Sequence, residues 1–171
     1  MSGDGTKYIM ESVYIETTIP SYYVARRSRD IVHAARQELT IEWWDNHRFT
    51  YELLSSQIVL EEISRGENSM AKKRLAMLSN VPLLVINERV VDLAEDLLAD
   101  DIVPLKASDD AIHIACASLH EVDYLLTWNC KHIANPHNKL RIQKCLTRHL
   151  VQMPVICTPE DFIGDVYDDN D

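Results

Sequence analysis

Short apolar runs alternate with longer segments of helical periodicity along the chain, and this order restricts the possible folds more than any other feature. Runs such as "SVYIE" and "DYLLTW" predict short buried strands, whereas the segments between such runs repeat apolar residues every three or four positions, as helices do. Strands separated by helices are joined by right-handed crossovers. We therefore expect an α/β fold with a mainly parallel sheet and helices on both of its faces.

Turn and cap residues set the limits of these elements. Ser108 stands where a helix cap is expected, Gly66 suits the left-handed end of a helix, and Pro136 suits a first helical turn. The predicted strands cover residues 12–16, 51–56, 81–86, 123–128 and 153–158. The predicted helices cover residues 29–48, 56–66, 69–79, 88–100, 108–121 and 136–150.

A single domain is expected for residues 1–159. The chain has 171 residues, of which 46% are hydrophobic, enough for one sizeable core, and neither a Ser/Gly-rich linker nor a repeat divides it. Residues 160–171 contain six acids and no Lys or Arg. We expect these residues to form an acidic, flexible tail, or a segment that folds over a basic groove and competes with nucleic acid.

The first residues lack the basic start and apolar run of a secretory leader, and no window approaches 18 uninterrupted apolar residues. We therefore expect a cytoplasmic protein without a membrane segment. The four cysteines form no CxxC pair, so free or buried thiols are expected in place of disulfides.

The net charge of −10 argues at first against a nucleic-acid partner, because phosphates attract Lys and Arg. Much of that charge lies in the acidic tail, however, and basic residues form three clusters elsewhere. Each cluster is either a solvated helix face or a phosphate-binding surface. The clusters are Arg26, Arg27 and Arg29; Lys72, Lys73 and Arg74; and Lys139, Arg141, Lys144 and Arg148.

Several common chemistries lack their motifs. The chain has no GxGxxG after a strand, no GxxxxGK[ST] and no GxSxG, which removes the main support for dinucleotide binding, P-loop hydrolysis and serine-hydrolase activity. What it offers instead is a sparse set of acids near strand ends and helix starts.

Three of these acids are candidates for one site at the carboxyl edge of the sheet. Glu16 ends an apolar strand, where a carboxylate is costly. Asp110 opens a helix that is apolar on most sides, although capping could also explain an acid there. Glu62 lies beside the core stripe of its helix, although a surface position like that of Glu61 is the alternative. Three converging carboxylates would repel one another, so we expect a hard cation, Mg²⁺ or Mn²⁺, to neutralise them.

At this point the sequence resembles a known family. "YIETTIPSY", "IVLEEISRG", "SDDAIHIACA" and "DYLLTWNCKHIAN", in this order and spacing, are similar to segments of the PIN-domain nucleases, above all the stand-alone bacterial PIN proteins related to VapC toxins. The resemblance covers residues 14–159. It implies a three-layer α/β/α sandwich that binds Mg²⁺ or Mn²⁺ and cleaves RNA.

The resemblance also assigns roles to particular residues. The metal-binding acids would be Glu16, Glu62 and Asp110, and Asn129 would complete the catalytic set. Family members generally have Asp where this chain has Glu16, and frequently Asp where it has Asn129. Thr17 falls on the small hydroxyl residue of the family pattern. We also expect Thr127 and His132 to position phosphate or water near the same edge, although His132 is alternatively a helix-cap or core histidine.

The expected function is a metal-dependent endoribonuclease, the toxin half of a type II toxin–antitoxin pair, with an antitoxin protein as partner and a homodimer as assembly. The alternative is a non-catalytic PIN-like module that binds RNA or protein. It arises because Asn129 removes one negative charge from the family's site and Glu16 places its carboxylate farther from the backbone than Asp would. The sequence names neither the RNA target nor the preferred metal.

Overall fold

The computed structural model describes residues 9–164 of the chain. Within this range the strands have two to five residues and the α-helices five to 13. The elements in chain order are β1 Ser12–Ile15, α1 Thr18–Val24, α2 Ile31–Glu42, the π-helical turn η1 Trp43–His47, the 3₁₀ turn η2 Arg48–Thr50, β2 Glu52–Ser56, α3 Gln57–Ile63, α4 Asn68–Met77, β3 Leu83–Leu84, α5 Glu88–Ala99, the 3₁₀ turn η3 Leu105–Ala107, α6 Ser108–Leu119, β4 Tyr124–Leu126, α7 Pro136–Arg148, β5 Val155–Cys157 and α8 Pro159–Ile163.

The sheet is entirely parallel among the described residues, with the strand order β3-β2-β1-β4-β5. β1 is central, and its residues Val13, Tyr14 and Ile15 are fully buried. In this order the chain winds outward from β1 in one direction and then returns to place β4 on the other side of β1. The connections therefore reverse between β1 and β4, which makes the carboxyl ends of these two strands the expected place for a site.

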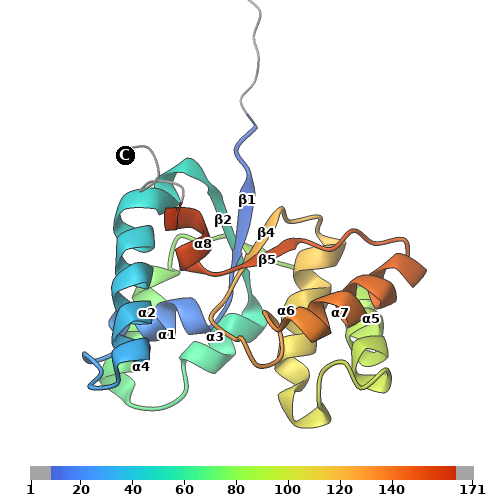
Figure 1. Cartoon of the computed structure of the whole chain (residues 1–171), viewed down its shortest axis with the longest axis horizontal. Coiled ribbons are helices and arrows are strands. Elements are labelled where there is room, and N and C mark those ends of the chain that lie inside the picture. The colour runs from blue at the N-terminus through green and yellow to red at the C-terminus, as the bar shows by residue number, and fades with distance from the viewer. Residues whose placement is uncertain (1–8, 165–171) are drawn as a thin grey trace, which may run out of the picture.

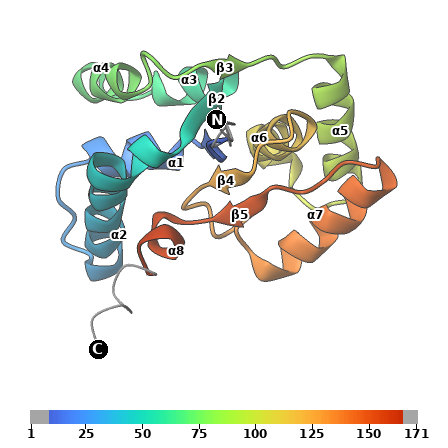
Figure 2. The ribbon, with the colours of Figure 1, turned by 90° about the horizontal axis from the view of Figure 1, so that it is seen from above.

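Helices cover both faces of the sheet, so the molecule has three layers (Figures 1 and 2). Seen from above, α1, α2 and α8 lie on one face, and α5, α6 and α7 lie on the other. The helix α6 is the most deeply buried of these, and its residues Ala111 and His113 to Ser118 are inaccessible or nearly so. This architecture confirms the predicted α/β fold with a parallel central sheet.

Two of the described helices, α1 and α8, were not predicted from the sequence. One helix cap was also placed wrongly. α6 begins at Ser108 itself and is preceded by Ala107, without a side-chain cap, so the prediction that Ser108 is the cap was wrong. Gly66 does adopt a positive φ of 87° after α3, and Pro136 opens α7 as expected.

The packed part of the chain extends into the predicted tail. α8 contains residues 159–163, Ile163 is buried, and Phe162 packs against the rings of Tyr51 and Tyr124. A capping box between Thr158 and Asp161 fixes the start of this helix. The rest of the predicted acidic tail, residues 165–171, lies outside the described residues, and so do residues 1–8.

The four cysteines are free thiols, as predicted, and only Cys130 is exposed. Burial raises the pKa of Cys116 and of Cys157 to about 12, so these two thiols stay protonated at neutral pH. Within residues 9–164, no helix has the length and apolar character needed to cross a bilayer.

Candidate active site

The candidate site lies where the connections reverse, at the carboxyl ends of β1 and β4. Glu16 follows β1 directly and Thr127 follows β4, and the Thr127 hydroxyl donates a hydrogen bond of 2.8 Å to Glu16 Oε2. Parallel pairing of Ile15 with Leu126 brings these two residues side by side. Both are almost inaccessible, since Glu16 is 3% exposed and Thr127 fully buried.

Glu16 is a buried carboxylate held by three donors. Besides Thr127, the backbone N–H of Thr18, at 3.0 Å, and the Thr18 hydroxyl donate to Glu16 Oε2. Burial raises the pKa of Glu16, while the positive charge of His113 and the hydrogen bonds from Thr18 and Thr127 limit that rise. The other oxygen, Oε1, accepts no hydrogen bond from any described residue.

Glu62 reaches the same edge from α3. Its Oε2 accepts a hydrogen bond from the Thr17 hydroxyl and lies 2.7 Å from His113 Nε2. Burial alone would raise the pKa of Glu62, but the hydrogen bond and charge of His113, together with Thr17, lower the pKa overall. Glu62 is therefore ionised at neutral pH and paired with a histidine from α6.

His113 connects the acids to the core of the protein. It is fully buried, and its Nδ1 shares a hydrogen bond of 2.9 Å with the Tyr14 hydroxyl, which also shares one of 2.6 Å with Ser56 Oγ. Burial would lower the pKa of His113, but its hydrogen bond to Glu62 and the negative charges of Glu16, Glu62 and Asp110 raise it. All three candidate acids are thus within electrostatic range of one buried imidazole.

Asp110 belongs to a second carboxylate–histidine pair. Its Oδ2 lies 2.7 Å from His132 Nδ1, and both side chains are mostly buried. The backbone N–H of His132 donates to Asn129 Oδ1, and the backbone N–H of Asn129 donates to the Thr127 hydroxyl. Asp110 is therefore held by a histidine and does not cap α6.

The seven residues named from the sequence lie in one connected network. Its two halves meet at Glu16. On one side Thr17 binds Glu62, and the next residue, Thr18, binds Glu16. On the other side Thr127 binds both Glu16 and Asn129. Sequence reasoning missed His113, the partner of Glu62. The available signal was its position three residues after Asp110, on the same face of a helix that is otherwise apolar.

Glu61 and Asp109, which precede Glu62 and Asp110 in the chain, are not part of this network. Glu61 is exposed, and Asp109 forms an ion pair of 3.7 Å with the exposed Arg65. The alternatives in which Glu62 is a surface residue like Glu61, or Asp110 a cap, are therefore not what the structure shows. Glu61 and Asp109 supply matched controls for substitutions of Glu62 and Asp110.

The carboxylate oxygens of this site suit a hard divalent cation, although the described residues do not form a complete set of metal ligands. Among residues 9–164, no group of three or more His, Cys, Asp or Glu side chains is arranged to hold an ion. Mg²⁺ needs less, because it keeps several waters and often binds through one or two carboxylates plus substrate phosphate. Each candidate acid has one oxygen without a hydrogen bond from a described residue, and these oxygens are the ones that could serve as ligands: Glu16 Oε1, Glu62 Oε1 and Asp110 Oδ1.

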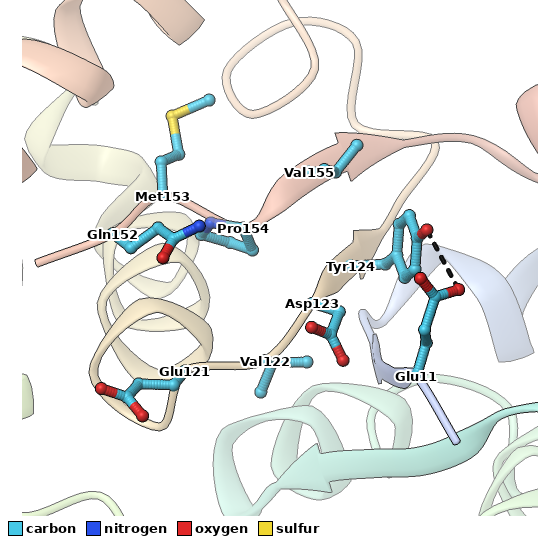
Figure 3. Close-up of a pocket in the computed structure, with 9 residues that line it drawn as sticks. All are labelled: Glu11, Glu121, Val122, Asp123, Tyr124, Gln152, Met153, Pro154 and Val155. Atoms are coloured by element: carbon cyan, nitrogen blue, oxygen red, sulfur yellow. Dashed lines mark hydrogen bonds between the residues drawn. The ribbon is translucent and has the colours of Figure 1, made fainter. Parts of the chain in front are cut away.

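A separate pocket lies at the opposite edge of the sheet, beside the amino ends of β1, β4 and β5 (Figure 3). It contains Glu11, Glu121 and Asp123. The Tyr124 hydroxyl donates to Glu11, and Asp123 accepts hydrogen bonds from the backbone N–H and hydroxyl of Ser12. Two of these acids thus stabilise the start of the sheet, and the pocket is remote from Glu16.

Comparison with solved structures finds chains of similar fold. The chain matches a chain in the crystal structure of VapBC2 from Rickettsia felis bound to a DNA fragment from their promoter, with a TM-score of 0.50 and 14% sequence identity. The match covers 86% of this chain and 98% of the other. No family model and no curated protein sequence matches the chain. At this identity the likeness concerns the fold, which is the three-layer, PIN-like arrangement expected from the sequence.

Proposed function

We propose that this protein is a metal-dependent endoribonuclease of the PIN class. The observation that carries the proposal is the network that joins Glu16, Glu62 and Asp110 at the point where the sheet connections reverse. Three acids drawn from distant segments into a partly buried edge are costly unless they serve binding or chemistry. The PIN-like fold supports the same reading.

In this proposal Glu16, Glu62 and Asp110 would hold Mg²⁺ or Mn²⁺, and the ion would supply charge neutralisation and activation of water for attack on phosphorus. The protein's own contribution is orientation. Thr17 and His113 hold the Glu62 carboxylate, Thr18 and Thr127 hold Glu16, and His132 holds Asp110. Asn129 orders the turn that carries His132.

We further propose that the protein acts in the cytoplasm as the toxin of a toxin–antitoxin pair, as a homodimer with an antitoxin partner. The named neighbour supports this reading, because its structure contains VapBC2 bound to promoter DNA. Purification from cells that express the flanking gene would show the antitoxin as a stoichiometric second chain. A chain that stays monomeric and alone would contradict this part of the proposal.

A second candidate is a PIN-like module that binds RNA or protein without cleaving. It is favoured by the two carboxylate–histidine pairs, in which His113 and His132 already balance part of the negative charge that a metal would balance. Such a module would bind single-stranded RNA with the same affinity with or without divalent metal.

The test is cleavage of a mixed RNA pool with Mn²⁺, with and without a chelator, by the wild type and by the neighbouring variants Glu62→Gln and Glu61→Gln. We expect the chelator to abolish cleavage and Glu62→Gln to slow it at least about 100-fold, since Glu62 is a proposed ligand. Glu61→Gln should cleave at the wild-type rate, because Glu61 is exposed. RNA binding without any cleavage in Mn²⁺ or Mg²⁺ would favour the second candidate.

A further inference from the structure

A second pocket, of about 370 Å³, opens between α1 and α2, and nothing described so far uses it. Its lining includes Tyr22, Arg26 and His33. Tyr22 follows Thr18 by four residues on α1, which is roughly 6 Å along a helix axis. Because the Thr18 hydroxyl binds Glu16, the pocket lies about one helical turn from the candidate active site.

Aromatic rings lead from the active-site edge into this pocket. The rings of Trp128 and Tyr22 have centroids 6.0 Å apart, and those of Tyr22 and His33 are 5.9 Å apart and parallel within 6°. Trp128 is 5% exposed, Tyr22 is half-buried and His33 is exposed, so the rings form a series from the interior to the surface. The backbone N–H of Trp128 donates to the Thr18 hydroxyl, which fixes the inner end of the series at the site.

Arg36 contacts the inner end of the aromatic series, the Trp128 ring. Its guanidinium lies 5.2 Å from the centroid of the Trp128 ring, a cation–π contact. Unpaired bases stack on aromatic faces held in this way, whatever their sequence.

The loop between α1 and α2 carries three arginines and is fixed by one buried amide. Gln37, 6% exposed, accepts a hydrogen bond of 2.8 Å from the Ser28 N–H. Its amide nitrogen donates to the carbonyls of Ala25, at 3.2 Å, and Arg26, at 2.9 Å. A loop that is already ordered loses less conformational entropy when it binds a ligand.

The arginines of this loop remain available for phosphate. Arg27 and Arg29 are exposed and form no ion pair with any described residue, and Arg26 has only an exposed pair of 3.7 Å with Glu67. Asp30 lies beside the pocket, but its carboxylate accepts hydrogen bonds from the backbone and ring of His33.

Several side chains of the other two basic clusters bond to carbonyl or carboxylate groups of the protein itself. Arg74 donates to the carbonyls of Ile63 and Arg65 at the end of α3. On α7, Lys139 donates to the Ile156 carbonyl, and Arg148 pairs with Asp100. Lys72 and Lys73 are exposed and form no ion pair with any described residue, so the feature that distinguishes the loop between α1 and α2 is its place beside an aromatic pocket.

We propose that this pocket is a subsite for one nucleotide of single-stranded RNA, next to the cleaved phosphate. The base stacks on Tyr22 and His33, and Arg27 and Arg29 bind the adjoining phosphates. The inference rests on the proposed ribonuclease function, since it names where that substrate binds, but it is testable by binding alone.

The test uses the full chain in EDTA, where no metal-dependent cleavage occurs, and a fluorescent eight-nucleotide RNA of mixed sequence. Tyr22→Leu keeps apolar volume and removes the stacking ring, and His33→Ala removes an exposed ring but keeps the backbone N–H that donates to Asp30 at the start of α2. We expect each to weaken binding roughly fivefold or more, and Tyr22→Phe to bind as the wild type does. A 2-aminopurine placed in the RNA should be quenched by the wild type and not by Tyr22→Leu.

The arginines are tested through salt dependence. Arg27→Ala with Arg29→Ala should reduce the slope of log affinity against log salt by roughly 1.4, for two lost phosphate contacts to a single strand. The matched control is Arg141→Ala with Lys144→Ala, which removes the same charge from α7, on the other side of the sheet, and should leave the slope unchanged.

Failures of the two proposals are distinguishable. Cleavage by the wild type together with unchanged RNA affinity in Tyr22→Leu and His33→Ala would overturn the subsite and keep the nuclease. This face, where Ile31 and Val32 are also exposed, would then belong to a protein partner. Equal binding of duplex and single-stranded RNA would also overturn the subsite, because a paired base cannot stack on Tyr22. Weakened binding without any cleavage would support the subsite and remove the nuclease.

Discussion

Single residues at the candidate site couple protonation to folding, and His113 does so most directly. Its pKa is raised above 6.5 in the folded protein by Glu62, Glu16 and Asp110 despite complete burial. The native state therefore binds this proton more tightly than the unfolded chain does. The resulting stabilisation is complete below pH 6.5 and is lost as the pH rises through the folded pKa.

The first prediction concerns His113→Gln in metal-free protein. Glutamine can still donate to Glu62 but cannot carry a charge, so the variant loses the proton-linked stabilisation. The difference in free energy of unfolding between wild type and variant should be largest near pH 6 and shrink as the pH rises towards 9. Urea unfolding at several pH values measures this, and a difference that is constant with pH would contradict it.

The second prediction concerns Thr127, a buried donor to Glu16. Thr127→Val keeps the shape and removes the hydroxyl, which leaves the buried carboxylate with one donor fewer. We expect a loss of about 1–3 kcal/mol in the free energy of unfolding at pH 7. Thr127→Ser retains the donor and should lose clearly less, so equal losses in the two variants would argue against this role for the hydroxyl.

At the scale of elements, sequence patterns predicted the sheet strands and most helices, and failed where tertiary packing decides. α1 contains Pro20 and several β-branched or aromatic residues, so its helical propensity is poor, yet Ile19 and Pro20 are buried against the sheet. The predicted strand 81–86 shrinks to Leu83–Leu84 at the sheet edge. No pattern predicted that Glu62 pairs with a histidine 51 positions away, because such a pairing arises only from the crossing of α3 and α6.

The third prediction concerns α8, the helix missed at the start of the predicted tail. Phe162 packs between the rings of Trp43, Tyr51 and Tyr124. Phe162→Ala should lower the free energy of unfolding by about 2 kcal/mol, less than for a fully buried ring, because Phe162 is only partly buried. Glu160→Gln, on the exposed side of the same helix, is the control. If Phe162→Ala unfolded like the control, α8 would not belong to the packed domain.

At the scale of the whole molecule, metal binding should raise the unfolding temperature. An ion that binds only the folded state stabilises it by about 2.7 kcal/mol at 100 times its dissociation constant. We therefore expect millimolar Mn²⁺ to raise the unfolding temperature of the wild type and to have no such effect on Asp110→Asn. Ca²⁺ and Na⁺ at matched ionic strength control for general salt effects. An unchanged melting temperature of the wild type in Mn²⁺ would contradict the proposed metal site.

The central claim, that Glu16, Glu62 and Asp110 form one catalytic site, is tested most directly by the cleavage rates of two neighbouring variants. Asp110→Asn and Asp109→Asn change the same chemical group one position apart, but Asp110 pairs with His132 at the site and Asp109 with Arg65 at the surface. Single-turnover cleavage of one RNA in Mn²⁺ should fall at least about 100-fold in Asp110→Asn and stay at the wild-type rate in Asp109→Asn. Equal rates in the two folded variants would contradict the account.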